Sequence, residues 1–490
     1  MRMPFPSLLI LVFLTLIASV GYSQEAISIT QTKSGKSILV ILVGVNEGIL
    51  TCKTEQGKQF DIPLSELSPD SVDRINAKMT SSSALSADDL ALGIKLNEFI
   101  GHQLFGSSSA LWNEDAETVA KRLDWRLESK KKDSSSYREY TGKDYLFLGA
   151  HPYCTTLYAG ENGKPERFSL VYANKGDFGS NLGMGPDHFK KMHPDREPPE
   201  NLDGAIALDA LLISESLSKE LGVGVTQFFG EKEDKRKVQR WNLGDHAFLL
   251  SSLEGEYTSL LIVPKIEADA QGKVKFINDS IMRKKQLTNV THRENGDVWI
   301  DNIPMVNQGP KGYCAPATFE RAMRYMLIPA DMYLLATAAT KPGGGTNTRK
   351  LSEDCKRIVR SKARTIKELD LEKDFEIKKL KTFIDKGVPV LWQMRSLDDY
   401  NELANKRSEE RKTVTDFAKW TKEIDAEAKD KIAGFKANDS NHHVCMVIGY
   451  NEETSEVAVS DSWGPNYELR WIHESIGKAV TSVGGFVIDF

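Results

Sequence analysis

One cysteine has surroundings that suit a nucleophile, in the stretch 306–326, VNQGPKGYCAPATFERAMRYM. From Phe319 onward the apolar residues recur at helical spacing. Pro316 is tolerated in the first turn of a helix, where its missing N–H would have no intrahelical partner. The pattern therefore predicts a helix over about 315–327 with Cys314 at its N-terminus. There the unsatisfied amides and the positive dipole end favour the thiolate, which is the nucleophile.

A thiolate hydrolase also needs a base, a group that orients the base, and a donor for the oxyanion. Gln308 precedes Cys314 by six residues in a tight loop. His443 begins the apolar strand in NHHVCMVIGY, with His442 as its competitor, and Asp461 ends the next strand, VAVSD. Because adjacent antiparallel strands bring such residues together, we expect Asp461 to accept a hydrogen bond from the His443 ring.

Four elements carry a resemblance, in order along the chain: QGPKGYC, KGVPVLWQ, the strand HVCMVIGY and the turn DSWG. Together they resemble the papain-type cysteine peptidases. The likeness is greatest to the bacteriocin-leader-processing group and its stand-alone relatives, in which the third residue is an aspartate. The resemblance implies a papain-like α+β fold over 296–490 and hydrolysis of peptide bonds without a cofactor.

By this resemblance Gln308 is the oxyanion-hole glutamine, Cys314 the nucleophile and His443 the base. His443 is preferred over its neighbour because it stands six residues before Gly449, as the family's histidine does. Asp461 occupies the position that papain fills with asparagine. The family would also use the tryptophan of DSWG, Trp463, to shield the histidine from water. The sequence departs from papain directly after the nucleophile, where it has alanine in place of tryptophan.

The five cysteines are few, scattered and odd in number, so at least one thiol should be free. No CxxC pair or Cys/His cluster indicates structural zinc. Free cysteine is among the most buried residue types, and for Cys445, on an apolar strand, we expect a packed thiol. The polar, glycine-rich approach favours the nucleophile for Cys314.

One histidine-containing stretch, MGPDHFKKMHPD, offers Asp187, His188 and His193 as metal ligands. The two histidines are five residues apart, whereas two ligands on one helix face need a spacing of about four. The bracketing prolines predict a solvated loop rather than a metal site.

Length and charge limit the architecture and the partners. A chain of 490 residues predicts two or three domains. The net charge of -5 is small for this size and indicates no nucleic-acid partner. Residues 1–23 contain Arg2, the apolar run LLILVFLTLIASV and then GYS, which is typical of a signal peptide. We expect a secreted or periplasmic protein with no integral membrane segment after signal removal.

The segment 24–80 predicts short strands separated by turns at SGK, NEG and EQGK. Its layout resembles a small Src-homology-like β-barrel, first described as a homology region of a yeast actin-cytoskeleton adaptor and recurrent in secreted bacterial proteins. The resemblance implies a module that engages a protein partner. A role as a structural cap remains open.

Residues 81–295 predict a mixed α/β central region that begins with a helix over 88–100. Strands are expected in DYLFLGAHPYCTTLYAG, ERFSLVYANKGDF and DHAFLLSSLEGEYTSLLIVPK. Similar preludes, LFG and FFG each followed by a helical stretch, suggest an internal duplication that equates Phe147 with Phe248. Farther on, the charged run 353–386 predicts solvated helix, and RSEERKTVTDFAKWTKEIDAEAKDKI predicts one or two amphipathic helices.

These observations predict an α+β multidomain protein: a small β-barrel, a mixed central region and a papain-like thiol hydrolase domain. The leading hypothesis is an exported cysteine peptidase that acts on a peptide or protein substrate through an acyl-enzyme on Cys314. A thiol acyltransferase or amidase with a non-protein substrate is a second hypothesis. A catalytically silent binding protein that uses the N-terminal barrel is a third.

Overall fold

The structure is a computed structural model that describes residues 26–32, 35–46, 49–54, 58–72, 74–75, 86–106, 110–179, 185–231, 235–273, 279–339, 346–437 and 439–490. The expected signal peptide lies outside these residues. The chain divides into two compact units, residues 1–84 and 85–490. The boundary expected at 295/296 therefore falls inside the second unit.

The first unit is an antiparallel meander in the order β1-β2-β3-β4. Its strands are β1 (Ile27–Thr30), β2 (Ser37–Asn46), β3 (Ile49–Lys53) and β4 (Gln59–Pro63), followed by the 3-10 turn η1 (Leu64–Glu66). A bridge between Gln31 and Leu67 returns the chain to the first strand. One face is apolar and buries Val40, Leu50 and Cys52, so the short strands expected here are confirmed.

The central region is built on an eight-stranded antiparallel sheet in the order β5-β6-β7-β8-β12-β11-β10-β9. The strands are β5 (Arg126–Lys130), β6 (Ser135–Glu139), β7 (Cys154–Ala159), β8 (Pro165–Asn174), β9 (Val225–Phe229), β10 (Arg236–Leu243), β11 (His246–Leu253) and β12 (Tyr257–Pro264). The sheet consists of two four-stranded meanders that meet where β8 pairs with β12.

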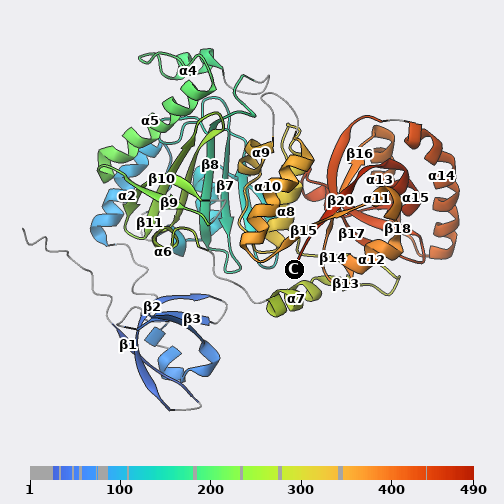
Figure 1. Ribbon diagram of the computed structural model, residues 1–490, viewed down its shortest axis with the longest axis horizontal. Helices are drawn as coiled ribbons and strands as arrows, with labels where there is room; N and C mark the ends of the chain where they lie inside the picture. The colour runs from blue at the N-terminus through green and yellow to red at the C-terminus, as the bar shows by residue number, and fades with distance from the viewer. Residues whose placement is uncertain are drawn as a thin grey trace, which may run out of the picture. The chain divides into compact units, whose positions relative to one another are not determined.

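Helices flank this sheet, and α2 and α5 lie against it (Figure 1). The helical elements of the region are α2 (Ala87–Ile100), η2 (Leu111–Asn113), α3 (Ala116–Leu123), α4 (Pro186–Met192), α5 (Leu202–Leu221), α6 (Lys265–Asp269) and α7 (Asp279–Thr288). The helix expected over 88–100 is confirmed as α2, which Ser86 caps by accepting from the Asp89 N–H at 3.0 Å.

Several local expectations for this region are wrong. The expected strand from Asp144 is a series of turns as far as Tyr153, and only the last six residues before Gly160 form β7. The solvated loop expected around Asp187 is the helix α4, because Pro186 stands at its first position, where proline suits a helix.

The sequence matches behind the suggested duplication fall on different kinds of structure. Strand β10 begins soon after Gly230, at Arg236, where a helical stretch was expected. Phe147 lies in a turn, whereas Phe248 lies within β11. Phe147 and Phe248 therefore do not occupy equivalent positions, although the two meanders have the same strand order, and the duplication stays a prediction.

The C-terminal region has a second sheet, in the order β13-β14-β17-β16-β20-β15, with β18 paired to β17 and β19 to β18. The strands are β13 (Val290–His292), β14 (Val298–Ile300), β15 (Thr365–Leu369), β16 (Val390–Arg395), β17 (His442–Asn451), β18 (Glu456–Ser460), β19 (Arg470–His473) and β20 (Thr481–Asp489). The strands expected after residue 387 are confirmed. Strand β15 lies within the charged run 353–386, where solvated helix was expected, so that expectation is wrong for these five residues. Their sequence TIKEL can carry charges because the strand lies at the edge of the sheet, paired only with β20 among the described strands.

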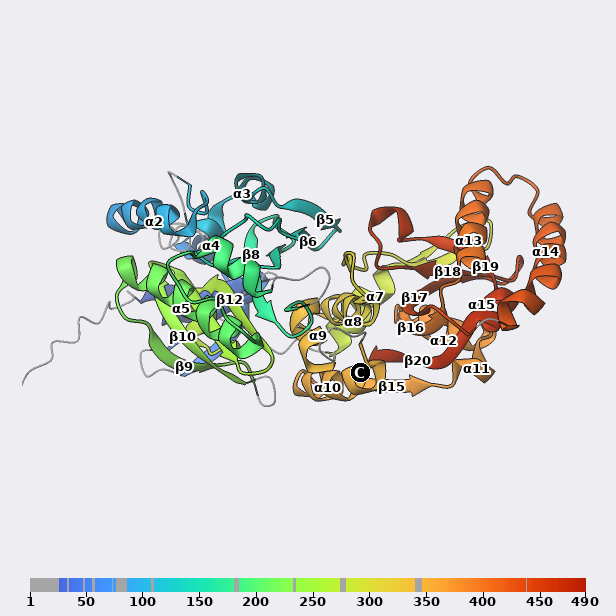
Figure 2. The ribbon, with the colours of Figure 1, turned by 90° about the horizontal axis from the view of Figure 1, so that it is seen from above.

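The helices of this region are α8 (Cys314–Tyr325), α9 (Met332–Ala339), α10 (Thr348–Ser361), α11 (Leu371–Asp374), α12 (Ile377–Ile384), α13 (Asp398–Arg411), α14 (Phe417–Ala437) and α15 (Glu474–Val480), with the 3-10 turn η4 (Pro465–Tyr467). Helix α8 lies against one side of the sheet, and α11 and α12 lie on the other (Figure 2). The expected helix over 315–327 and the expected amphipathic helices α13 and α14 are confirmed.

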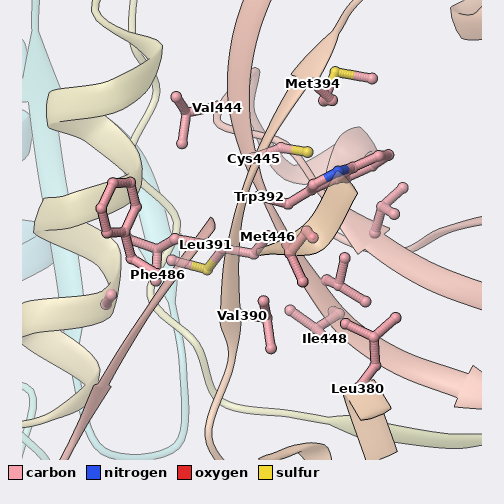
Figure 3. Packing of buried hydrophobic residues seen from close by; sticks show 14 of the residues in the cluster. Leu380, Val390, Leu391, Trp392, Met394, Val444, Cys445, Met446, Ile448 and Phe486 are labelled. Carbon is pink, nitrogen blue, oxygen red and sulfur yellow. The ribbon is translucent and has the colours of Figure 1, made fainter. Parts of the chain in front are cut away.

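The core of the C-terminal region is formed by the middle strands of its sheet (Figure 3). Trp392 is fully buried there beside Cys445 and Met446 of the neighbouring strand. A separate apolar cluster joins central residues such as Val171 to Tyr313 and Ala317. The two regions therefore share a hydrophobic core. In the part of the chain that is described, no helix is long and apolar enough to cross a membrane.

Candidate functional site

Cys314 is the first residue of α8, and its side chain is partly exposed. The helix begins there because Pro316 fits its first turn and the polar loop before it cannot continue the helical pattern. The rest of α8 is almost wholly buried, from Ala315 to Met323. The thiol thus stands at a helix N-terminus held rigidly in the core.

Two polar residues of α8 tie the helix to the strands that carry the other candidates. The Thr318 hydroxyl donates to the backbone oxygen of Val444 at 2.9 Å. The Arg321 guanidinium donates to the Ser460 hydroxyl at 2.6 Å and also reaches Ser462. Because these partners are the immediate neighbours of His443 and Asp461, the helix sets the position of both residues relative to the thiol.

His443 and Asp461 are brought together by the pairing of β17 with β18. His443 Nε2 lies 2.9 Å from Asp461 Oδ1, and both side chains are buried. The ring nitrogen left for Cys314 is therefore Nδ1. His442 points away from this site: its side chain is 61% exposed and lies near Asp439.

Asp461 has a second partner that the sequence analysis did not single out. Its other oxygen, Oδ2, is paired with Arg470 of β19, which is 1% exposed. Arg470 Nη1 also donates to the Asn405 side-chain oxygen of α13 at 3.0 Å and to that of Asn401 at 3.3 Å. The carboxylate is thus fixed at both oxygens, and the inserted helix α13 supports it.

Trp463 packs on the imidazole. The His443 and Trp463 rings are stacked with centroids 4.8 Å apart and an interplanar angle of 29°. Tyr467 meets Trp463 edge-on at 5.4 Å. The indole of Trp463 covers one face of the imidazole and limits the access of water to its hydrogen bond with the carboxylate.

The electrostatics favour an ion pair between thiolate and imidazolium. Burial alone would raise the pKa of Cys314, but the hydrogen bond and charge of His443 lower it, with help from the backbone amides of Val444 and Ala315. Burial opposes the charge on His443, yet Asp461 and Cys314 raise its pKa to about 9. Despite its burial, Asp461 has its pKa lowered to about 2 by Arg470 and His443.

The other cysteines provide an internal comparison. All five cysteines are described, and all are free thiols. Burial raises the pKa of Cys52, Cys154, Cys355 and Cys445. The expectation that Cys445 is a packed thiol is confirmed by its complete burial. A lowered pKa distinguishes Cys314 from all of them.

Gln308 lies in the loop that leads to the thiol. Its backbone N–H donates to the oxygen of Ser462 at 2.8 Å, which joins this loop to the turn after Asp461. Its side-chain Nε2 donates to the Lys311 oxygen at 3.3 Å. Its Oε1 is buried and has no hydrogen-bond partner among the described residues. The side-chain amide has two N–H groups, and because only one of them donates to Lys311, the other is left for another acceptor.

Sequence reasoning missed Thr318, Arg321 and Arg470. A signal for Arg470 was present in YELRWI, because an arginine within an apolar strand must find a partner when the strand is buried. Within the described residues, no group of three or more His, Cys, Asp or Glu residues could hold a metal ion.

A thiol at a helix N-terminus, paired with a histidine that a buried carboxylate holds, is the arrangement that thiol hydrolases use. Residues 300–476, which contain all four candidate residues, match the family model described as the Peptidase_C39 like family. The match supports placing this C-terminal region in the superfamily of papain-like and C39 peptidases, and it indicates cysteine peptidase activity in general. No curated protein sequence matches the chain.

Proposed function

We propose that the protein hydrolyses peptide bonds through an acyl-enzyme on Cys314. The observation that carries this proposal is the lowered pKa of Cys314 beside His443, whose ring is held by Asp461 at 2.9 Å. Such a pair supplies the nucleophile and the acid in their reactive forms at neutral pH.

In the first step the Cys314 thiolate attacks the peptide carbonyl carbon, a C–S bond forms, and the carbonyl π electrons move onto oxygen. As the tetrahedral intermediate collapses, the His443 imidazolium gives its proton to the leaving nitrogen and the C–N bond breaks. The neutral imidazole then takes a proton from water while that water attacks the thioester. Collapse of this second intermediate releases the acid and restores the thiolate.

The oxyanion formed in each step needs donors that are already in place. The N–H of Cys314 is one, because the first amides of a helix have no intrahelical acceptor. The remaining N–H of the Gln308 side chain is the other. Asp461 keeps the His443 ring in one orientation and stabilises the imidazolium.

The first test is the pH dependence of alkylation by iodoacetamide in the wild type and in His443→Ala. Labelling of Cys314 that persists well below the free-thiol pKa of about 8.5, and that is lost without the imidazole, is expected. In parallel, Cys314→Ala should abolish cleavage of a fluorogenic peptide library without unfolding. A rate that rises only near the ordinary thiol pKa in both proteins would contradict the proposal.

We also propose that the protein is exported and that residues 24–80 form a small barrel that engages a protein partner. The signal-like segment 1–23 and the meander β1–β4 support these two points. Fractionation of cells that express the full chain, with N-terminal sequencing of the product, tests export. Recovery of uncut protein from the cytoplasm would contradict it.

A further inference from the structure

The segment 307–313, which carries Gln308 and leads to the nucleophile, lies against the central region. The Tyr140 hydroxyl, just after β6, donates to the backbone oxygen of Asn307. The Tyr140 ring covers Gly309 so closely that a Cβ at this glycine would lie 2.7 Å from the ring. Gly309 also has a positive φ of 68°, so any other residue there would be strained.

A turn of the central region, residues 174–178, packs against the other end of the segment. Within the turn, the Asn174 side chain accepts from the Gly176 N–H at 3.1 Å and donates to Asp177 at 2.8 Å. Asp177 is buried and paired with Lys311. A Cβ added at Gly176 would collide with the hydroxyl of Tyr313. The turn thus contacts both residues that flank Gly312.

Buried charged side chains link the central region to the C-terminal region. Glu128 of β5 accepts from the Asn307 N–H at 2.9 Å and from Arg138 Nε at 2.7 Å. Arg138 also donates to Glu320 of α8 at 2.9 Å. All three charged side chains are at most 6% exposed. Separating the regions would break the bonds to Asn307 and Glu320 and expose the apolar cluster around Tyr313 to water, so the two regions are joined by a buried interface.

We propose that the turn 174–178 and Tyr140 act as a clamp that holds residues 307–313 in the conformation required for oxyanion binding by Gln308. This inference rests on the proposed function and adds the central region to its site. Gly176, Asp177 and Tyr140 are positioning residues, since they act through the segment and not on the substrate.

The clamp predicts that thiolate formation and oxyanion binding depend on different parts of the structure. The thiolate pair depends on α8, β17 and β18, through the bonds of Thr318 and Arg321. Oxyanion binding depends on the clamped segment. Substitutions that disrupt the clamp should therefore lower the rates of reactions that pass through an oxyanion. They should leave unchanged the rates of reactions that need only a thiolate.

Two small probes separate these steps in the full chain. Iodoacetamide alkylates the Cys314 thiolate by displacement at a saturated carbon and forms no oxyanion. p-Nitrophenyl acetate acylates the same thiolate through a tetrahedral oxyanion. Gly176→Ala should lower the acylation rate by about tenfold or more, since one oxyanion donor contributes about 10²–10³ in rate. The alkylation rate and its pH profile should stay at the wild-type level.

The double variant Gly176→Ala/Tyr313→Phe provides the rescue, because it removes the hydroxyl that the new methyl group meets. Its acylation rate should return to that of Tyr313→Phe alone. Gly142→Ala is the matched control, since this exposed glycine of the central region has no neighbour within 4 Å of an added Cβ. Asp177→Asn removes the ion pair with little change of shape. It replaces Gly176→Ala as the test variant if that protein does not fold.

Hydrogen exchange of the amides of Gln308 and Tyr313 reports on the clamp independently of chemistry. Faster exchange in Gly176→Ala, reversed in the double variant, is expected. If exchange and acylation both match the wild type, the clamp is wrong. If exchange responds as expected but the wild-type thiol is unreactive at neutral pH, the clamp stands and the peptidase proposal fails.

Discussion

At the scale of single residues, the environment of a thiol decides its chemistry. Cys314 and Cys445 lie close in space, since α8 packs on β17. Cys445 points into an apolar core and its pKa is raised, whereas Cys314 meets an imidazole and helix amides and its pKa is lowered. Desolvation acts on both, so the specific partners determine the outcome.

The pH profile of kcat/KM follows from the ion pair. Activity should rise as Cys314 loses its proton and fall as His443 loses its proton, with the alkaline midpoint near pH 9. Asp461→Asn removes the charge that helps to raise the pKa of His443, so its alkaline midpoint should move to lower pH. A wild-type midpoint near the ordinary histidine pKa of about 6.5 would contradict the ion pair.

Arg470 is the residue on which the orientation of Asp461 depends. Arg470→Gln leaves a buried carboxylate oxygen without its cation, so the free energy of unfolding should fall by about 3–5 kcal/mol. Arg470→Lys should recover part of this loss, because a lysine keeps the charge but lacks the fork that also reaches Asn405. Urea denaturation measures both variants. Equal stability of Arg470→Gln and wild type would show that the pair is not needed.

At the scale of elements, α8 organises the site. It supplies the thiol at its N-terminus and, one turn farther on, the hydroxyl that fixes β17 next to His443. Arg321 fixes the end of β18 in the same way. A single buried helix therefore sets the distances among the thiol, the imidazole and the carboxylate.

Thr318→Val tests this role with little change of shape. The variant removes the hydrogen bond to Val444, so we expect a loss of about 1–3 kcal/mol in the free energy of unfolding and slower alkylation of Cys314 at pH 6. Thr155→Val is the matched control, because Thr155 is equally buried and its hydroxyl has no partner among the described residues. If both variants behave alike, the bond to the strand is not what places the helix.

At the scale of the whole molecule, the central region and the C-terminal region behave as one body. They share the apolar cluster around Tyr313 and the buried network of Arg138, Glu128 and Glu320. Unfolding of one region exposes the core and the charges of the other. The stabilities of the two regions within residues 85–490 are therefore coupled through this shared interface.

One buried acid makes this stability depend on pH. Asp209 of α5 is 1% exposed, accepts from the Ala173 N–H at 2.9 Å, and its other oxygen lacks a partner among the described residues. Burial raises its pKa to about 7. Because the folded state binds this proton more tightly than the unfolded state, Asp209 reduces stability progressively as pH rises from about 4 to about 7.

Asp209→Asn should remove this dependence, since asparagine mimics the protonated acid. The variant should be more stable than wild type at pH 8, by up to roughly 4 kcal/mol from the size of the pKa shift. The two proteins should have similar stability near pH 4. Urea titrations at several pH values measure the difference, and a constant gap across this range would contradict the assignment.

Much of the site could be predicted from the sequence, because the residue patterns that indicate its helix and strands are local. The helix after Cys314 follows from apolar spacing and Pro316, and β17 and β18 follow from short apolar runs. Local signals failed where context outweighed them. The charged segment TIKEL forms β15 because β20 offers it backbone partners, and the segment before β7 forms turns despite its apolar residues.

The sequence by itself determined the residue types of the candidate site, their order and the elements that carry them. Helical and strand periodicity depend only on residues that are close together in the chain. The pairing of His443 with Asp461 was expected from the sequence, and the structure places the two side chains 2.9 Å apart. Only the tertiary structure decided that Arg470 holds the carboxylate and that Tyr140 and Asp177 touch the loop before the thiol. These contacts join residues of different elements, up to 167 positions apart in the chain. Their pairing, and the pKa values that depend on it, exists only once packing has removed the groups from water.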